Sequence, residues 1–169
     1  MFLVVTAQND NDKLKLLINV IPFEEQYLKD FKLLNREWLE QYFIVEPFDE
    51  YQLSNPKQEI IEKGGYIFLA KQVESIIGTV ALMKENDRSF EITKMSVTKN
   101  SQGKGTSKLL MNACIKIAEE KKWHRLYLYS NTVLLPAIKL YYRYGFKEIP
   151  LDMNSHYDRT NIKMELKLM

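Results

Sequence analysis

The chain has 169 residues and a mass of 20.0 kDa, enough for one well-buried core and too little for two independent ones. Hydrophobic residues make up 46% and charged residues 27%, a balance that argues against an intrinsically disordered chain. The formal net charge is only +2, and basic residues are interleaved with acidic ones, so neither nucleic acid nor a membrane is an expected partner. We therefore expect a single domain over residues 1–169.

Apolar segments and cysteine content bear on the cellular compartment. The opening apolar run, residues 1–5, is too short for the core of a signal peptide, and no later run approaches the length of a membrane span. Cys114 is the only cysteine, so no internal disulfide can form. These features favour a cytoplasmic protein.

The first third of the chain predicts a strand followed by helices. Residues 13–20 are rich in Leu, Ile and Val and predict a strand that ends at Pro22. Large apolar side chains then recur every three or four residues, which predicts one helix or two abutting helices: Tyr27, Phe31, Leu34, Trp38 and Tyr42. Pro47 interrupts this pattern. Asn55 resembles the N-cap of a short helix that runs to Lys63.

The remainder of the chain alternates between strands and helices. Three β-type runs with short polar connections predict an antiparallel meander over residues 66–70, 75–83 and 90–97. Helical and strand patterns then follow in the order helix 103–122, strand 125–129, helix 135–144, strands 146–149 and 161–168. The pattern is that of one mixed α/β domain.

A glycine-rich turn joins the third strand of this meander to the next helix. Glycines allow the backbone to approach a phosphate closely, and the unpaired amides of a first helical turn point toward an anion. Gly103 and Gly105 lie at this turn. A nucleotide P-loop would need another glycine where this chain has Thr98, so that alternative is rejected. The turn predicts a site for a phosphate-bearing ligand.

Two segments resemble motifs of the GNAT superfamily of acetyl-CoA-dependent N-acetyltransferases. Residues 102–107 (QGKGTS) resemble the pyrophosphate loop Gln/Arg-x-x-Gly-x-Gly/Ala, and residues 137–146 (AIKLYYRYGF) resemble Ala-x-x-x-Tyr-x-x-x-Gly-Phe. The resemblance covers residues 66–147. It implies a three-layer α/β fold, in which helices flank a central mixed, mostly antiparallel sheet and two splayed strands form the acyl-CoA cleft.

The same resemblance implies a function. The enzyme would move the acetyl group of acetyl-CoA directly onto a primary amine, of a small molecule or a peptide, in a ternary complex without a metal ion. The resemblance also allows the protein to form a homodimer. A GNAT-like module that binds acyl-CoA without turnover remains an alternative.

The resemblance also assigns residues that bind acetyl-CoA. Backbone groups of Met95, Ser96 and Val97 would pair with the pantetheine arm. The pyrophosphate would be held by Gln102, Gly103, Lys104, Gly105, Thr106 and Ser107. Ser107 departs from the usual Gly or Ala, and Leu134 occupies a position where Asn is common, so Asn131 is a candidate substitute for that contact.

Amine acetylation needs a base, a polarised carbonyl and an acid for the departing thiolate. By resemblance, Tyr141 is the acid, although its apolar neighbours also fit a core tyrosine. Glu91 lies eleven residues before Gln102, the spacing of the base in the histone-acetylating branch of the superfamily. A structural role for Glu91 stays open. An amide near Val97 would polarise the carbonyl.

Other reactive side chains have simpler explanations. Cys114 lies on the apolar face of a helix and reads as a buried thiol, and His124 follows a helix end. His156, in the polar stretch 152–160, is a weak candidate beside the acceptor site. Charged loops are common, so we favour ordinary surface charge for the acidic cluster of Glu46, Asp49 and Glu50.

Overall fold

The structure is a computed structural model that describes residues 18–152 and 157–168. Its elements in chain order are β1 (Ile18–Pro22), η1 (Glu25–Tyr27), α2 (Leu28–Tyr42), α3 (Pro47–Ser54), η2 (Lys57–Ile61), β2 (Tyr66–Gln72), β3 (Ser75–Asn86), β4 (Ser89–Val97), η3 (Lys99–Ser101), α4 (Thr106–Glu120), β5 (Arg125–Ser130), α5 (Leu135–Arg143), β6 (Lys147–Ile149) and β7 (Ile162–Lys167). This order confirms the predicted mixed α/β fold.

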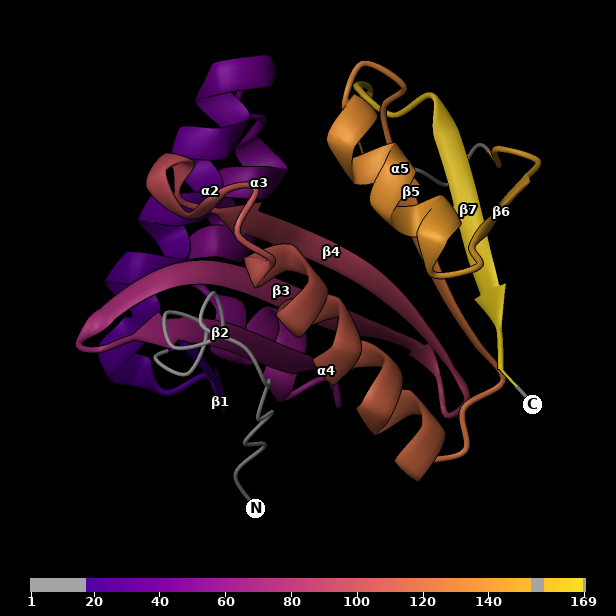
Figure 1. Cartoon of the computed structure of the whole chain (residues 1–169), viewed down its shortest axis with the longest axis horizontal. Helices are drawn as coiled ribbons and strands as arrows, with labels where there is room; N and C mark the ends of the chain where they lie inside the picture. Colours follow the sequence, from indigo (N-terminus) through magenta and orange to yellow (C-terminus); the bar gives the residue numbers. More distant parts are fainter. Residues whose placement is uncertain (1–17, 153–156, 169) are drawn as a thin grey trace.

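The strands form one sheet of order β1-β2-β3-β4-β5-β7-β6. The first four strands pair antiparallel with their neighbours, which confirms the predicted meander. β5, β7 and β6 also pair antiparallel, whereas β4 and β5 are parallel. The single parallel junction joins two antiparallel halves, and β4 and β5 diverge from it toward the upper edge of Figure 1.

Helices cover both faces of the sheet, as Figure 1 shows: α4 and α5 lie in front of it, and α2 and α3 lie behind. One core cluster contains apolar side chains of α4, including Leu110 and Met111, and the other contains Phe31 of α2 and Leu53 of α3. Gly78 allows α4 to approach β3, since a Cβ there would lie 3.1 Å from Leu110 Cδ1. This close packing fixes the start of α4 over the sheet.

The helical pattern is interrupted before Pro47 as predicted, since α2 ends at Tyr42, but a further helix that the sequence did not predict, α3, begins at this proline. Proline is tolerated in a first helical turn, where its missing N–H is no loss. The side chains of Glu46 and Asp49 form a capping box with each other's backbone amides. Asn55 was wrongly predicted as an N-cap: its amide donates to Tyr51 O at 2.9 Å, at the C-terminus of α3.

Among the described residues, the first strand, β1, begins at Ile18 and includes Pro22. The earlier part of the predicted strand, residues 13–17, lies outside the described residues. Within residues 18–152 and 157–168, no helix is long and apolar enough to cross a membrane.

Candidate active site

The site begins where β4 and β5 separate. They pair only between Ser89–Glu91 and Arg125–Tyr127, so the edge of β4 beyond Glu91 has no strand partner on the β5 side. A register shift places two residues of β4, Lys94 and Met95, opposite the single residue Val80 of β3. Lys94 has a φ of 52°, and such bulges bend and twist a strand. The bulge and the short parallel pairing together open the sheet.

A cavity of about 510 Å³ occupies this opening. It is lined from α2, β4, the loop before α4, β5, α5 and residues 157–160. Most of the predicted site residues line it: Glu91, Met95, Ser96, Val97, Gln102, Gly103, Gly105, Ser107, Asn131 and Tyr141. Lys104 and Thr106 do not. The fold therefore brings together residues that are spread over fifty positions of the sequence.

The loop at the start of α4 has the form expected of an anion site. Gly103 and Gly105 have φ of 73° and 90°, in the left-handed region that favours glycine. A Cβ at Gly103 would meet nothing within 4 Å, so the backbone there faces open space. Gly105 is the N-cap of α4 and offers no side-chain acceptor to the amides of the first turn. Free amides, the helix dipole and open space fit the pyrophosphate of acetyl-CoA.

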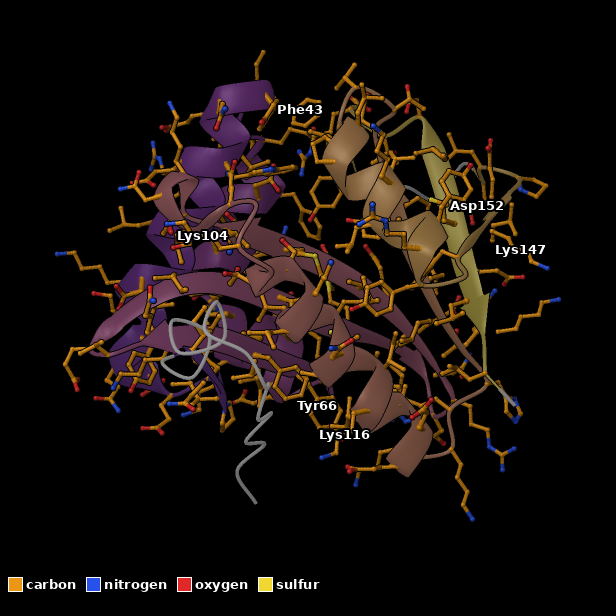
Figure 2. All side chains as sticks on the ribbon, in the orientation of Figure 1. Phe43, Tyr66, Lys104, Lys116, Lys147 and Asp152 are labelled. Atoms are coloured by element: carbon orange, nitrogen blue, oxygen red, sulfur yellow. The ribbon has the colours of Figure 1, made fainter. Side chains whose placement is uncertain are left out.

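Lys104 and Thr106 contribute differently from the glycines. The Lys104 side chain is exposed at the start of α4 (Figure 2), and Thr106 is buried with its methyl group toward Gly78. Neither residue lines the cavity, and both contribute backbone groups to the loop. Their predicted binding role, like that of the other loop residues, stays a prediction.

The open edge of β4 presents backbone groups to the cavity. Thr98 N donates to Ile77 O at 2.9 Å, so the backbone N–H and C=O of Thr98 point toward β3. Because these groups alternate in direction along a strand, the N–H and C=O of Val97 point toward the cavity. Val97 O accepts a hydrogen bond from Gln102 Nε2 at 3.1 Å, which leaves the Val97 amide on the open edge. Ser96 Oγ donates to Leu34 O, so its side chain points toward α2 instead.

Glu91 lies at the base of the opening, at the last residue of β4 that pairs with β5. The pKa of its carboxyl is raised to about 7, because burial outweighs the attraction of Lys94 and Lys163. Among the described residues, Glu91 makes no side-chain hydrogen bond. An unshared carboxylate with a pKa near neutrality is suited to accept a proton at physiological pH.

Tyr141 reaches the cavity from α5 and is 8% exposed. Burial raises the pKa of its phenol to about 12, so the hydroxyl keeps its proton at neutral pH. Within residues 18–152 and 157–168, this hydroxyl has no hydrogen-bond partner. The ring packs in the core beside Phe146, at 6.0 Å between ring centroids, while the hydroxyl remains available as a donor. The two interpretations given for Tyr141 are compatible.

Asn131 lines the cavity, but both ends of its side-chain amide have protein partners. Its Nδ2 donates to Arg159 O at 2.6 Å, and its Oδ1 accepts from Val133 N at 3.0 Å. These bonds tie the loop after β5 to the segment before β7. The predicted contact with the pantetheine arm stays a prediction.

A buried ionic cluster forms the far wall of the cavity, and sequence reasoning missed most of it. Asp49 has no exposed surface, and its carboxylate binds both terminal nitrogens of Arg159, at 2.8 and 2.9 Å. Lys94 Nζ lies 3.3 Å from the same carboxylate and 2.7 Å from the Tyr157 hydroxyl. Burial by itself would raise the pKa of Asp49, but Arg159 and Lys94 hold it below its usual value. The sequence signals for this cluster were the acidic residues Glu46 and Asp49, interpreted as surface charge, and the polar stretch 152–160.

The remaining candidates have structural explanations. Cys114 is fully buried in the core, which raises the pKa of its thiol and keeps it protonated. The Arg88 guanidinium donates to His124 Nε2 at 2.8 Å, on the surface. Glu46 forms an ion pair with Arg159. Glu50 forms ion pairs with Lys32 and Arg36. His156 lies outside the described residues.

Comparison with known proteins agrees with this geometry. Residues 31–146, more than half of the chain, match the acetyltransferase (GNAT) family. The chain is 28% identical over 126 residues to an uncharacterized N-acetyltransferase of Schizosaccharomyces pombe, covering 72% of this chain and 77% of the relative. It is 30% identical over 99 residues to N-acetylaspartate synthetase of Xenopus tropicalis, covering 57% of this chain and only 36% of that enzyme.

A solved structure supports the same assignment at the level of the fold. A GNAT-family acetyltransferase of Staphylococcus aureus Mu50 superposes with a TM-score of 0.82 at 21% identity, covering 90% of this chain and 99% of the other. The chain therefore belongs to the acetyltransferase (GNAT) family and is an acyl-CoA N-acyltransferase.

Proposed function

We propose that this protein transfers the acetyl group of acetyl-CoA directly to a primary amine while both substrates are bound. The observation that carries the proposal is the convergence on one cavity of the open β4 edge, the glycine loop, Glu91 and Tyr141. Acetyl-CoA supplies the acetyl group as a thioester. Everything else in the reaction is binding, orientation and proton movement by the residues of this chain.

Each proton has a residue suited to it. Glu91, with a pKa of about 7, accepts a proton from the ammonium of the acceptor, directly or through water. The Val97 amide, on the open edge of β4, donates to the carbonyl oxygen that gains charge. As the new C–N bond forms and the C–S bond breaks, the Tyr141 hydroxyl, which keeps its proton at neutral pH, donates that proton to the departing sulfur and is reprotonated by the second proton that the nitrogen loses.

A module that binds acyl-CoA without turnover would have no need for these two side chains. In such a module, burying the Glu91 carboxyl without a hydrogen-bond partner would lower the stability of the fold without contributing to its function. The raised pKa of Glu91 and the unshared Tyr141 hydroxyl therefore favour an active transferase.

Binding of CoA to the glycine loop is tested by calorimetry on Gly105→Asp. The new carboxylate would stand against the pyrophosphate at a residue with φ of 90°, so we expect CoA affinity to fall by more than about 100-fold. Gly105→Ala introduces the same backbone strain without the charge, and it should retain measurable binding. Unchanged affinity in Gly105→Asp would overturn the proposal. Release of free thiol from acetyl-CoA on addition of an amine then tests turnover.

A further inference from the structure

The charges on the acceptor side of the cavity restrict the amine that it can take. Among the described residues that line the cavity, the carboxylates are Asp49 and Glu91. Asp49 Oδ1 accepts from Arg159 and Lys94, and Asp49 Oδ2 accepts from Arg159 and the Glu46 amide. A carboxylate has about four acceptor positions, so Asp49 is saturated. Glu91 alone remains for a cationic group of the acceptor.

The cations on this side are held in ion pairs with carboxylates. One terminal nitrogen of Arg159, Nη1, donates hydrogen bonds to both Asp49 and Glu46. The other, Nη2, donates to Asp49. Lys94, whose side chain is 5% exposed, is held by Asp49 and the Tyr157 hydroxyl. The other cations lining the cavity, Lys108 and Arg143, belong to α4 and α5 on the side of the glycine loop. Among the described residues that line the cavity, the cations near Glu91 are therefore already paired, which disfavours an acceptor with a carboxylate.

Aromatic rings make up much of the remaining surface on this side. Trp38, Tyr42 and Phe43, at the end of α2, form a contiguous group with ring centroids 5.8 to 6.4 Å apart, and all three line the cavity. Figure 2 shows Phe43 on the side of α2 that faces the β5–β7 half. Tyr129 and Tyr157 line the cavity from that half. We call these five residues the aromatic wall.

We infer that the acceptor is a small primary amine whose only charge is the reacting ammonium and whose body is an aromatic ring. The inference rests on the proposed acetyl transfer. One unshared carboxylate matches one ammonium, and the aromatic wall matches a flat apolar body by stacking. Among the described residues that line the cavity, the further cations of a polyamine would meet no unshared carboxylate besides Glu91, and the carboxylate of an acidic amino acid would meet only cations that are already paired.

The test is a comparison of kcat/KM for four amines at saturating acetyl-CoA: 2-phenylethylamine, spermidine, L-aspartate and a hexapeptide with a free amino terminus. We expect the value for 2-phenylethylamine to exceed each of the others by at least about 10-fold, since unpaired charges are strongly rejected by such a site. A higher value for any of the other three would overturn the inference.

A second measurement uses binding alone. 2-Phenylethylamine is titrated by calorimetry into protein saturated with CoA, and into two variants that exchange exposed tyrosines. Tyr42→Ala removes a ring of the aromatic wall that is 44% exposed, and Tyr51→Ala removes a ring that is 54% exposed and does not line the cavity. We expect a loss of roughly 2- to 10-fold in amine affinity for Tyr42→Ala and none for Tyr51→Ala. Equal effects of the two variants would contradict the assignment of the wall.

These outcomes separate this inference from the proposed function. Intact CoA binding together with faster acetylation of spermidine, aspartate or the peptide would reject the aromatic acceptor and leave the transferase standing. Absence of CoA binding to the parent protein would reject both.

Discussion

The two sides of the cavity are built in different ways. The acyl-CoA side consists mainly of backbone groups from one short stretch, the end of β4 and the loop to α4. The acceptor side consists of side chains that meet from distant parts of the chain: 110 residues separate Asp49 from Arg159, and 63 separate Lys94 from Tyr157. The first side needs only local backbone geometry, whereas the second exists only in the folded chain.

This contrast predicts different responses to mutation. Backbone amides remain when side chains are exchanged, so the acyl-CoA side should tolerate most substitutions outside its glycines. The ionic cluster of the acceptor side shares its hydrogen bonds among several residues, so the loss of one member leaves buried charge behind.

The largest effect is expected from Arg159→Met, which breaks the acceptor side. Asp49 is fully buried and would lose two charge-assisted bonds, and the remaining contact with Lys94 would compensate in part. We expect the free energy of unfolding to fall by about 3 kcal/mol, the low end for a broken buried pair. Urea unfolding measures it. Arg36→Met, which removes exposed pairs with Glu40 and Glu50, is the control and should leave the midpoint unchanged.

Tyr141→Phe should act on turnover alone. The change deletes one oxygen without a protein partner among described residues and leaves the ring packed, so stability and CoA affinity should persist. We expect kcat to fall by about 100-fold, the lower end for general acids, because a thiolate is already a fair leaving group. Steady-state kinetics should show no matching rise in the KM for acetyl-CoA. Tyr142→Phe, at an exposed ring, serves as control, and full activity of Tyr141→Phe would remove the acid role.

Glu91→Gln should weaken catalysis less, and in a manner that depends on pH. A carboxylate with a pKa of about 7 is a weak base toward an ammonium near ~10, so we expect kcat/KM at pH 8 to fall by roughly 30-fold. In the parent, kcat/KM should rise with pH through about 7 as Glu91 ionises, and this limb should be missing in Glu91→Gln. Identical pH profiles would mean that Glu91 has a structural role.

The same variant tests the burial of Glu91 without any substrate. The pKa is about 7 in the folded chain against ~4.3 unfolded, so the unfolded state binds fewer protons between these values. The contribution of Glu91 to the stability of the parent should therefore fall as pH rises from about 4 to 7 and then level off. Glu91→Gln should melt at a higher temperature than the parent at pH 8 and at a similar temperature at pH 4. The opposite order would contradict a raised pKa.

The smallest effect is expected from Lys104→Ala on the acyl-CoA side. Lys104 is exposed and does not line the cavity, and its backbone amide survives the change. Calorimetry should show CoA affinity reduced by less than about 5-fold, the range of an exposed charge. A loss as large as that of Gly105→Asp would show that side chains, and not backbone groups, dominate this side.

The sequence by itself determined the element order from β2 onward and the glycine loop. Strand alternation, helical spacing and glycines at left-handed positions are local properties, so Gly103, Gly105 and the α5 motif with Tyr141 could be found without the fold. The sequence analysis missed α3, a helix that begins at Pro47 and is capped by Glu46 and Asp49.

Only the tertiary structure decided the acceptor side. Asp49 looked like ordinary loop charge, and Lys94 gave no signal in the middle of a strand, yet the β4 bulge and the approach of Arg159 bury both in one cluster. The pKa of Glu91 was equally hidden, because it depends on how much solvent the folded chain excludes from the carboxyl. Backbone geometry is determined by neighbouring residues, whereas burial and charge pairing arise from contacts between residues far apart in the chain.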